Sequence, residues 1–422
     1  MRFVYSLCLY LLSPLVFLYF FWRGIRERVY WRGWLQRFGW GRRRPPGSLW
    51  VHAASVGEVQ AAVPLIRSLQ GAYPDRSVTL TCFTPTGVAQ AARQFDESVD
   101  CRLLPLDLPG AMARFIKRQR PDLLVIIETE IWPNLLAACR KRAVPVVFAN
   151  ARMMPRSLRR YTRGPLASLF GQALAGVDRI AAASEDDAER FMTLGVPENR
   201  VEVTGNLKLD FQVDETVRRQ GLAWRESWGG KRPVWVAGST HEGEERRVLD
   251  AHQRLLKDFP ELLMVLVPRH PARFHAVADL CRGQKLETAR RSENHRVKQS
   301  TRVLLGDTLG ELLDLYAAAD VALVGGTLVR GIGGHNLLEP AALGVPVIVG
   351  PHQGGWAEVA GWLREAGALI TCSSVDEIVE AMQEALRDNE GRRAAGLAAR
   401  QAVEVRAGAT ARTQALIAEV LA

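Results

Sequence analysis

Short, fully apolar runs alternate along this chain with longer stretches in which apolar residues recur every three or four positions. The first kind of run predicts strands, and the second kind predicts amphipathic helices. Strands are expected at residues 48–53, 77–81, 123–127, 144–149, 180–183 and 201–204, with helices at 59–70, 87–95, 135–142 and 186–194 between them. Strands that are apolar throughout, each followed by a helix, indicate a parallel sheet with helices on both faces.

The same alternation starts again after a break. Charge rises and periodicity weakens over residues 206–232, and further strands are predicted at 234–237, 262–267, 303–305, 321–324 and 345–349. We therefore expect an α/β fold in which two Rossmann-like doubly wound domains face each other across a cleft. The N-terminal domain is expected at residues 45–210, and the C-terminal domain, with a helical tail, at 211–422. Ligands of such sheets bind at the carboxyl ends of the strands.

Residues 1–44 have a different pattern. Residues 3–22 contain no charged side chain, and a helix of that length is just able to cross ~30 Å of hydrocarbon. The segment is predicted to be a membrane anchor, either single-pass or monotopic. Pro14 follows Ser13 in the middle of the run, so a re-entrant hairpin is a further arrangement. A cleaved signal peptide is the competing interpretation, but no small-x-small cleavage motif precedes Trp22 and arginines follow at once.

The charge distribution favours a membrane partner over nucleic acid. The first fifty residues hold nine arginines and one glutamate, so they carry +8 of the chain's net charge of +10. Tryptophans are interleaved with these arginines, as is typical of the lipid headgroup zone. The basic character is therefore local and predicts attraction to anionic lipid of the inner leaflet, with no nucleic-acid partner. The positive-inside rule places the rest of the chain in the cytoplasm, and six cysteines without a CxxC pair fit a reducing compartment.

Carboxylates follow two predicted strands of the first domain. Ser55, Gly57 and Glu58 open the helix after the first strand, where S-x-x-E is a capping box. The alternative is that Glu58 is a general base at the floor of the cleft. Glu128 and Glu130 follow a buried strand, where carboxylates are costly unless they are paired or used. A favourable interaction with the dipole of the next helix is the other explanation for this pair.

Cationic and small residues stand at comparable places. Lys208, near the domain junction, is either a surface lysine or a cation that neutralises a carboxylate or phosphate. Gly238, Ser239 and Thr240 follow the first strand of the second domain and precede a helix predicted at 241–250. Backbone N–H groups at such a helix start can bind an anion, although ordinary capping explains the same residues.

Two further motifs lie in the second domain. Arg269 and His270 stand between prolines at the end of an apolar strand, which aims the arginine outward and suits phosphate, while His270 has a structural alternative. Residues 333–340 form the sharpest motif. Gly334, with its neighbouring glycine, permits close backbone approach to a ligand. His335 and Asn336 then lead into a helix whose first turn contains Glu339, an acid able to accept two ribose hydroxyls. A plain capped helix is the alternative.

Several signatures are absent from the sequence. It contains no Walker A run and no GxGxxG, which argues against a P-loop ATPase and a dinucleotide enzyme. It also contains no Asp-x-Asp and no HExxH, which argues against a metal-dependent sugar-nucleotide transferase or a zinc hydrolase.

Taken together, the motifs resemble those of the 3-deoxy-D-manno-octulosonic acid (Kdo) transferase family of lipopolysaccharide synthesis. The resemblance covers nearly the whole chain, and its carriers are SVGE (55–58), ETEIWPN (128–134), GNLKLD (205–210), PRH (268–270), GDTLGEL (306–312) and GGHNLLEP (333–340). It implies a metal-independent GT-B glycosyltransferase without a cofactor. Its donor would be CMP-Kdo and its acceptor a hydroxyl of a lipid A precursor, with inversion at the anomeric carbon.

The resemblance also implies roles for particular residues. Glu58 would be the general base, and Glu130 and Lys208 would support the transition state, although whether Glu128 or Glu130 is the functional carboxylate stays open. The CMP part of the donor would be bound by Pro268, Arg269, Leu309, Gly310, Glu311, Asn336, Leu337, Leu338 and Glu339.

Other functions remain as alternatives at this stage. One is another membrane-associated GT-B transferase that uses a UDP-sugar and a lipid-linked acceptor. A second is a sugar-nucleotide epimerase, which would need no anchor, and a third is a catalytically silent lipid-binding adaptor. Stabilisation by CMP more than by UDP would favour the Kdo transferase.

Overall fold

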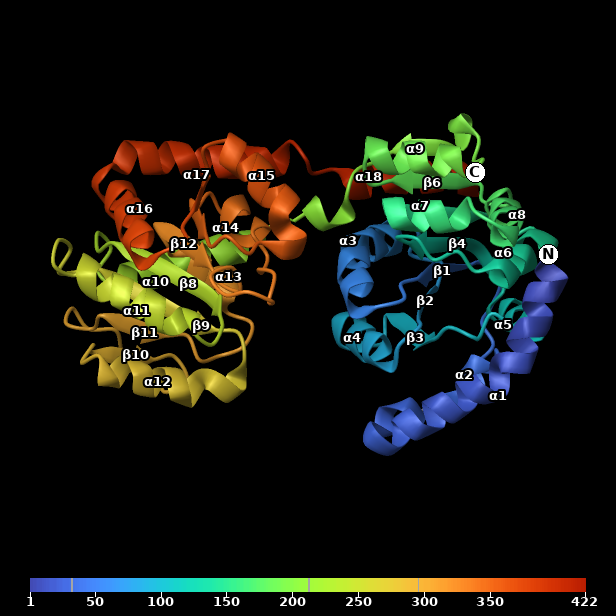
Figure 1. Cartoon of the computed structure of the whole chain (residues 1–422), viewed down its shortest axis with the longest axis horizontal. Coiled ribbons are helices and arrows are strands. Elements are labelled where there is room, and N and C mark those ends of the chain that lie inside the picture. Colours follow the sequence, from blue (N-terminus) through green and yellow to red (C-terminus); the bar gives the residue numbers. More distant parts are fainter. Residues whose placement is uncertain (32, 212, 295) are drawn as a thin grey trace. The chain divides into compact units, whose positions relative to one another are not determined.

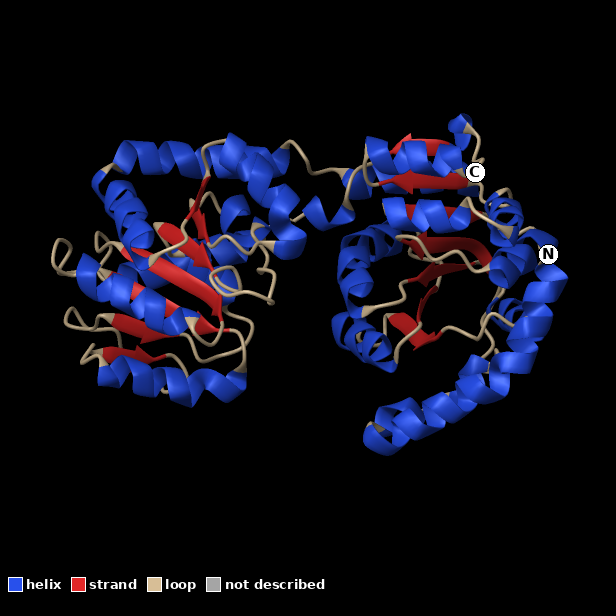
Figure 2. Cartoon of the chain, viewed as in Figure 1, coloured by secondary structure: helices blue, strands red, loops and turns tan. Residues whose placement is uncertain are grey.

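The computed structural model describes residues 1–31, 33–211, 213–294 and 296–422 of the chain. Two compact units make up the chain: one comprises Met1–Asp210 and Ala407–Ala422, and the other comprises Phe211–Arg406. Each unit contains one seven-stranded parallel sheet with helices packed on it (Figures 1 and 2). The expected class, two Rossmann-like doubly wound domains, is confirmed.

The first sheet has the order β3-β2-β1-β4-β5-β6-β7. Its strands are β1 (Ser48–His52), β2 (Val78–Cys82), β3 (Val99–Leu103), β4 (Pro121–Ile127), β5 (Val146–Ala151), β6 (Arg179–Ala182) and β7 (Val201–Val203). Its helices are α3 (Val56–Ala72), α4 (Pro85–Phe95), α5 (Pro109–Gln119), α6 (Pro133–Lys141), α7 (Pro155–Tyr161), α8 (Pro165–Leu174) and α9 (Glu185–Thr193). The strand order reverses between β1 and β4, and ligands of doubly wound sheets bind at such a switch point.

The apolar strands of this sheet are buried because helices cover both of its faces. Leu49 and Val51 of β1 pack in one core cluster, while Trp50, between them, packs in the other. Successive side chains of a strand point to opposite faces, so a strand between two layers is apolar at most of its positions. β3 was not predicted from the sequence, because it is an edge strand that carries Asp100 and Arg102.

The second sheet has the order β10-β11-β9-β8-β12-β13-β14. Its strands are β8 (Val234–Thr240), β9 (Leu263–Pro268), β10 (Thr288–Arg290), β11 (Val303–Leu305), β12 (Val321–Val324), β13 (Val347–Val349) and β14 (Leu369–Thr371). Its helices are α10 (Glu215–Ser227), α11 (Glu244–Leu255), α12 (Phe274–Gly283), α13 (Leu312–Ala317), α14 (Leu338–Ala342), α15 (Ala357–Glu365), α16 (Val375–Arg387) and α17 (Asn389–Glu404). Here the order reverses between β8 and β12.

The last helix, α18 (Ala409–Leu421), belongs to the first unit, whereas the sequence placed the whole helical tail in the second domain. Leu416 and Ile417 of α18 are buried in the core cluster that contains Leu65 of α3. The carboxylate of Asp210 caps the helix by accepting the backbone N–H of Ala409 at 3.1 Å and also those of Gly408 and Thr410. Apolar burial and this cap hold the end of the chain on the first unit.

The N-terminal helix α1 (Arg2–Arg26) is continuous, so the re-entrant hairpin is not formed. Pro14 lies inside it and has no N–H to donate to the carbonyl of Tyr10; the hydroxyl of Ser13 donates to that carbonyl at 2.8 Å instead. Among the residues that the structure describes, α1 is the one helix long and apolar enough to cross a membrane.

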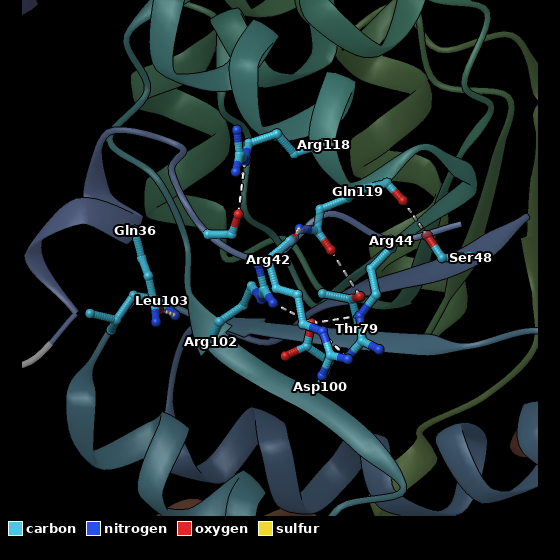
Figure 3. A network of polar contacts seen from close by, with 11 residues as sticks. Gln36, Arg42, Arg44, Ser48, Thr79, Asp100, Arg102, Leu103, Arg118 and Gln119 are labelled. Carbon is cyan, nitrogen blue, oxygen red and sulfur yellow. Dashed lines mark hydrogen bonds and ion pairs between the residues drawn. The ribbon is translucent and has the colours of Figure 1, made fainter. Parts of the chain in front are cut away.

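The basic segment after α1 is partly built into the first unit, beginning with the short helix α2 (Trp34–Arg37) (Figure 3). Gln36 accepts the backbone N–H of Leu103 at 2.8 Å, and Arg44 pairs with Asp100 at 2.9 Å. Arg37 is buried and donates to the carbonyl of Phe83 at 2.7 Å. Some of the arginines expected at lipid headgroups are thus structural, and Arg32 lies outside the described residues.

Candidate active site

Glu58 lies in the first turn of α3, directly after β1. Its Oε2 accepts the N–H of Ala54 at 2.7 Å and its Oε1 accepts the hydroxyl of Ser55 at 2.8 Å. Its own N–H donates weakly to Ser55 Oγ at 3.4 Å, so the predicted capping box is formed. Each carboxylate oxygen keeps a second lone pair. Gly57, one residue earlier, is exposed, and a side chain there would meet no atom within 4 Å, so the start of α3 has open space beside Glu58.

A second carboxylate, Glu130, lies in the loop after β4, across the switch point from Glu58. Burial, followed by the charge of Glu58, raises the pKa of Glu130 to about 7. Burial also raises the pKa of Glu58, against the opposing effects of its hydrogen bonds to Ser55 and Ala54. Two neighbouring carboxylates in a partly desolvated place favour a state in which one holds a proton and the other is ionised.

Glu128 and Lys208 form an ion pair beside these residues. Lys208 Nζ lies 2.8 Å from Glu128 Oε1, with the two side chains 38% and 26% exposed. Glu128 has a φ of 59°, which is strained for a residue other than glycine, and such strain collects at functional sites. Of the two candidate carboxylates, Glu128 is paired with a cation, whereas burial raises the pKa of Glu130.

One residue of this region was missed by the sequence analysis. Asn150, near the end of β5, is fully buried with a φ of 54°, and its Oδ1 accepts the N–H of Leu207 at 3.0 Å. It thereby fixes the short 3₁₀ helix Leu207–Leu209, from which Lys208 reaches Glu128. The only signal in the sequence is an amide side chain within an apolar strand.

The second unit corrects the expected anion site at Gly238–Thr240. These residues belong to strand β8, and α11 begins later, at Glu244. The buried carboxylate of Glu244 accepts the N–H of His241, just before this helix, at 2.9 Å, and the N–H groups of Gly326 and Leu328, in the loop after β12, at 2.7 and 2.8 Å. This acid therefore ties the start of α11 to the loop after β12. A Cβ on Gly238 would lie 2.0 Å from the hydroxyl of Tyr316, so internal packing requires this glycine.

A cluster of imidazoles lies at the switch point of the second sheet. His241 Nε2 and His335 Nε2 are 2.7 Å apart with nearly parallel rings, and the ring of His270 stands edge-on to His241 at 5.2 Å. Burial, then the nearby His241 and Arg269, lowers the pKa of His335 to about 4. His241 was not predicted, although its place directly after β8 matches that of the predicted residues.

Arg269 and Glu339 come together at the same edge of the sheet. Arg269 follows β9 and is exposed, and its charge lowers the pKa of Glu339, which burial raises more strongly. Asn336 Nδ2 donates to Glu339 Oε1 at 3.1 Å. Glu339 lies in α14, which has only five residues, and Gly334, just before that helix, donates its N–H to the carbonyl of Gly326 at 2.8 Å.

The remaining predicted donor residues differ in accessibility. Leu309 and Gly310 are exposed in the loop after β11, and Glu311 pairs with Arg291 at 2.7 Å. Leu337 and Leu338 are 0% and 1% exposed, so only their backbone groups can reach a ligand. Pro268 is the buried last residue of β9. The loops after β11, β9, β8 and β12 all leave one edge of the sheet, because these strands are parallel neighbours.

Comparison with known proteins identifies relatives of both units. A family model described as 3-deoxy-D-manno-octulosonic-acid transferase (kdotransferase) matches residues 32–211, and a second one, glycosyl transferases group 1, matches residues 245–402. A 3-deoxy-D-manno-octulosonic acid transferase of Haemophilus influenzae is 40% identical over 97% of this chain and 96% of its own length. One from Bordetella pertussis is 39% identical over 98% and 97%.

Among solved structures, UDP-GlcNAc 2-epimerase from Neisseria meningitidis, bound to UDP-GlcNAc, aligns with a TM-score of 0.56 and 16% identity. The alignment covers 89% of this chain and 99% of that chain. This likeness concerns the two-domain fold alone.

Proposed function

Because the chain belongs to the Kdo transferase family, and is therefore a glycosyltransferase of GT-B type, we propose that it transfers Kdo from CMP-Kdo to a hydroxyl of the lipid A precursor lipid IVA, with inversion. The observation that carries the proposal is the carboxylate pair of Glu58 and Glu130 at the switch point of the first sheet, with the pKa of both groups raised.

The pair suits general base catalysis. A base works best when its pKa approaches the working pH, and burial moves Glu58 in that direction. Since the pKa of Glu130 is raised to about 7, Glu130 would be the member of the pair that holds a proton, and Glu58 would be the base. Glu58 would accept the proton of the acceptor hydroxyl. At the same time, the oxygen of that hydroxyl would form a bond to the anomeric carbon of Kdo, and the bond between this carbon and the phosphate of CMP would break.

The second unit would hold the donor. CMP leaves as a phosphate monoester, and its charge needs donors prepared in advance. Arg269 and the cluster of His241, His270 and His335 lie in the loops after β8, β9 and β12 and offer such donors. Glu339, next to Asn336, would accept the ribose hydroxyls, and the exposed Leu309 and Gly310 would line the nucleotide.

We further propose that the protein works at the cytoplasmic face of a bacterial inner membrane. The apolar α1 and the surplus of arginine in the first fifty residues support this location, as does an acceptor that is itself a lipid.

The test is incubation of the full-length protein with CMP-Kdo and lipid IVA, followed by mass spectrometry of the lipid. The expected product is lipid IVA that has gained Kdo, together with free CMP. The same reaction with a UDP-sugar in place of CMP-Kdo is the control. An unchanged lipid in the first reaction, or a modified lipid in the second, would refute the assignment.

A further inference from the structure

Helix α1 has two unlike faces that run along its whole length. One face is partly or fully shielded by the protein and consists of Tyr5, Ser6, Leu9, Ser13, Val16, Phe17, Phe20, Arg23 and Gly24. The other is 48–79% exposed and consists of Phe3, Leu7, Leu11, Leu15, Leu18, Trp22 and Ile25. We call these sets the inner stripe and the outer stripe. Both repeat at helical spacing, so each is a continuous band from one end of α1 to the other.

The inner stripe is attached to the first unit at both ends of the helix. Near the N-terminal end, the hydroxyl of Tyr5 donates to Asp107 at 3.0 Å, and Ser6 donates to Asn134 at the same distance. Near the other end, the guanidinium of Arg37 lies 5.0 Å from the ring centre of Phe20 and also donates to the carbonyls of Phe83 and Leu104. Tyr5 and Phe20 are separated by about 22 Å along a helix axis at 1.5 Å per residue. Figure 1 shows α1 along one side of the first unit, beside α5 and α6.

We propose that α1 lies in the plane of the cytoplasmic membrane surface and does not cross the bilayer. A spanning helix would carry Tyr5 most of the way across ~30 Å of hydrocarbon while Phe20 stayed near the cytoplasm. Asp107 cannot move into the hydrocarbon together with Tyr5, because its carboxylate also accepts two N–H groups at the start of α6. These belong to Asn134 and Leu135, at 3.1 and 2.8 Å. Crossing would leave this buried acid without the Tyr5 contact and bring polar protein surface into hydrocarbon.

The segment that follows α1 also suits an anionic bilayer. Trp31, Leu35 and Trp40 are 45%, 71% and 46% exposed and add apolar side chains that solvent can reach. Arg26, Arg28, Arg42 and Arg43 are also exposed and supply the charge expected at lipid phosphates. A second copy of this chain would bring the same arginines against one another, so the bilayer is the occupant that the charges favour.

This inference rests on the membrane location in the proposed function, and the experiment separates the two. Cys8 is exposed, so it is first replaced by serine in the full-length chain, and that variant measures background labelling of the other thiols. Single cysteines at Leu7, Leu11, Leu15 and Trp22 of the outer stripe, and at Leu9 and Val16 of the inner stripe, then receive a nitroxide. Depth is measured in phosphatidylcholine–phosphatidylglycerol vesicles from the relative relaxation by oxygen and a nickel chelate. Val405→Cys, at a site 81% exposed in the second unit, is the water-exposed reference.

An in-plane helix gives nearly equal depth at Leu7 and Trp22, and shallower labels at Leu9 and Val16 than at their outer neighbours. A spanning helix would instead give the deepest labels at Leu11 and Leu15 and shallow labels at Leu7 and Trp22, with no difference between the stripes. That result would overturn the in-plane arrangement and leave the membrane location intact. Failure to bind vesicles would refute both the location and the arrangement. Kdo transfer measured in detergent tests the chemistry independently of all three outcomes.

Discussion

The sharpest test of the chemistry replaces Glu58 by glutamine. Glutamine keeps the carbonyl oxygen that accepts the N–H of Ala54, and its amide can donate to Ser55, so the start of α3 stays capped. The cost in folding free energy is at most about 1 kcal/mol. The raised pKa of Glu58 lowers this cost further. It means that the folded state destabilises the ionised carboxylate, and the substitution removes that charge.

The expected loss of turnover is much larger than this change in stability. Removal of a general base lowers the rate by at least ~10²-fold, equivalent to about 2.7 kcal/mol of transition-state stabilisation. The assay is the initial rate of Kdo addition to lipid IVA, measured by mass spectrometry at saturating CMP-Kdo, with urea unfolding as the measure of stability.

The chain contains a matched control for this substitution. Glu377 forms the same capping box at the start of α16, accepting the N–H of Ser373 at 2.8 Å while its own N–H donates to Ser374 at 3.2 Å. Glu377→Gln is therefore expected to change stability by a similar amount and to leave turnover unchanged. Near-wild-type turnover in Glu58→Gln, or an equal loss in Glu377→Gln, would show that Glu58 is only a cap.

Three further predictions follow from the two units. If Glu130 acts in its protonated form, kcat falls as the pH rises through about 7, and this alkaline limb disappears in Glu130→Gln; a pH–rate profile that keeps the limb would contradict the assignment. His241→Ala removes the partner of His335 and should weaken CMP binding by about tenfold, which is equivalent to one lost charge-assisted hydrogen bond. Calorimetry measures this affinity, and an unchanged value would exclude the imidazole cluster from the donor site. Asp210→Ala removes the cap of α18 and should lower the free energy of unfolding of the first unit by about 1–2 kcal/mol. Amide hydrogen exchange should then become faster in β6 and α3 but not in β8, and equal effects in both units would refute this account.

Much of the fold was predictable, because strands buried on both faces are apolar at most positions. Trp50 and its neighbours Leu49 and Val51 show the reason, since they pack in different cores. The edge strands β3, β10 and β14 were not predicted, because none of them is completely buried. In addition, β3 contains charged residues, and β10 and β14 have only three residues each. The attachment of α18 to the first unit could not be predicted, because it depends on contacts almost two hundred residues away in the sequence.

The candidate site was predicted at the level of loops and less well at the level of individual contacts. Placement after a buried strand was enough to single out Glu58 and Glu130. It could not reveal that Glu244, at the start of α11, accepts the N–H groups of Gly326 and Leu328, because these belong to a loop after another strand. Nor could it separate the arginines that face solvent from Arg37, which is buried against backbone carbonyls. Such distinctions depend on long-range geometry that composition does not encode.

The position of α18 has a consequence for biosynthesis. Because the first unit consists of residues from both termini, a ribosome that has made the first 406 residues has produced an incomplete domain. The apolar side of α3, including Ala62 and Leu65, then lacks the helix that later covers it. Helix α1 is therefore synthesised long before the first domain can close, and deletion of residues 407–422 should leave a product that chaperones retain.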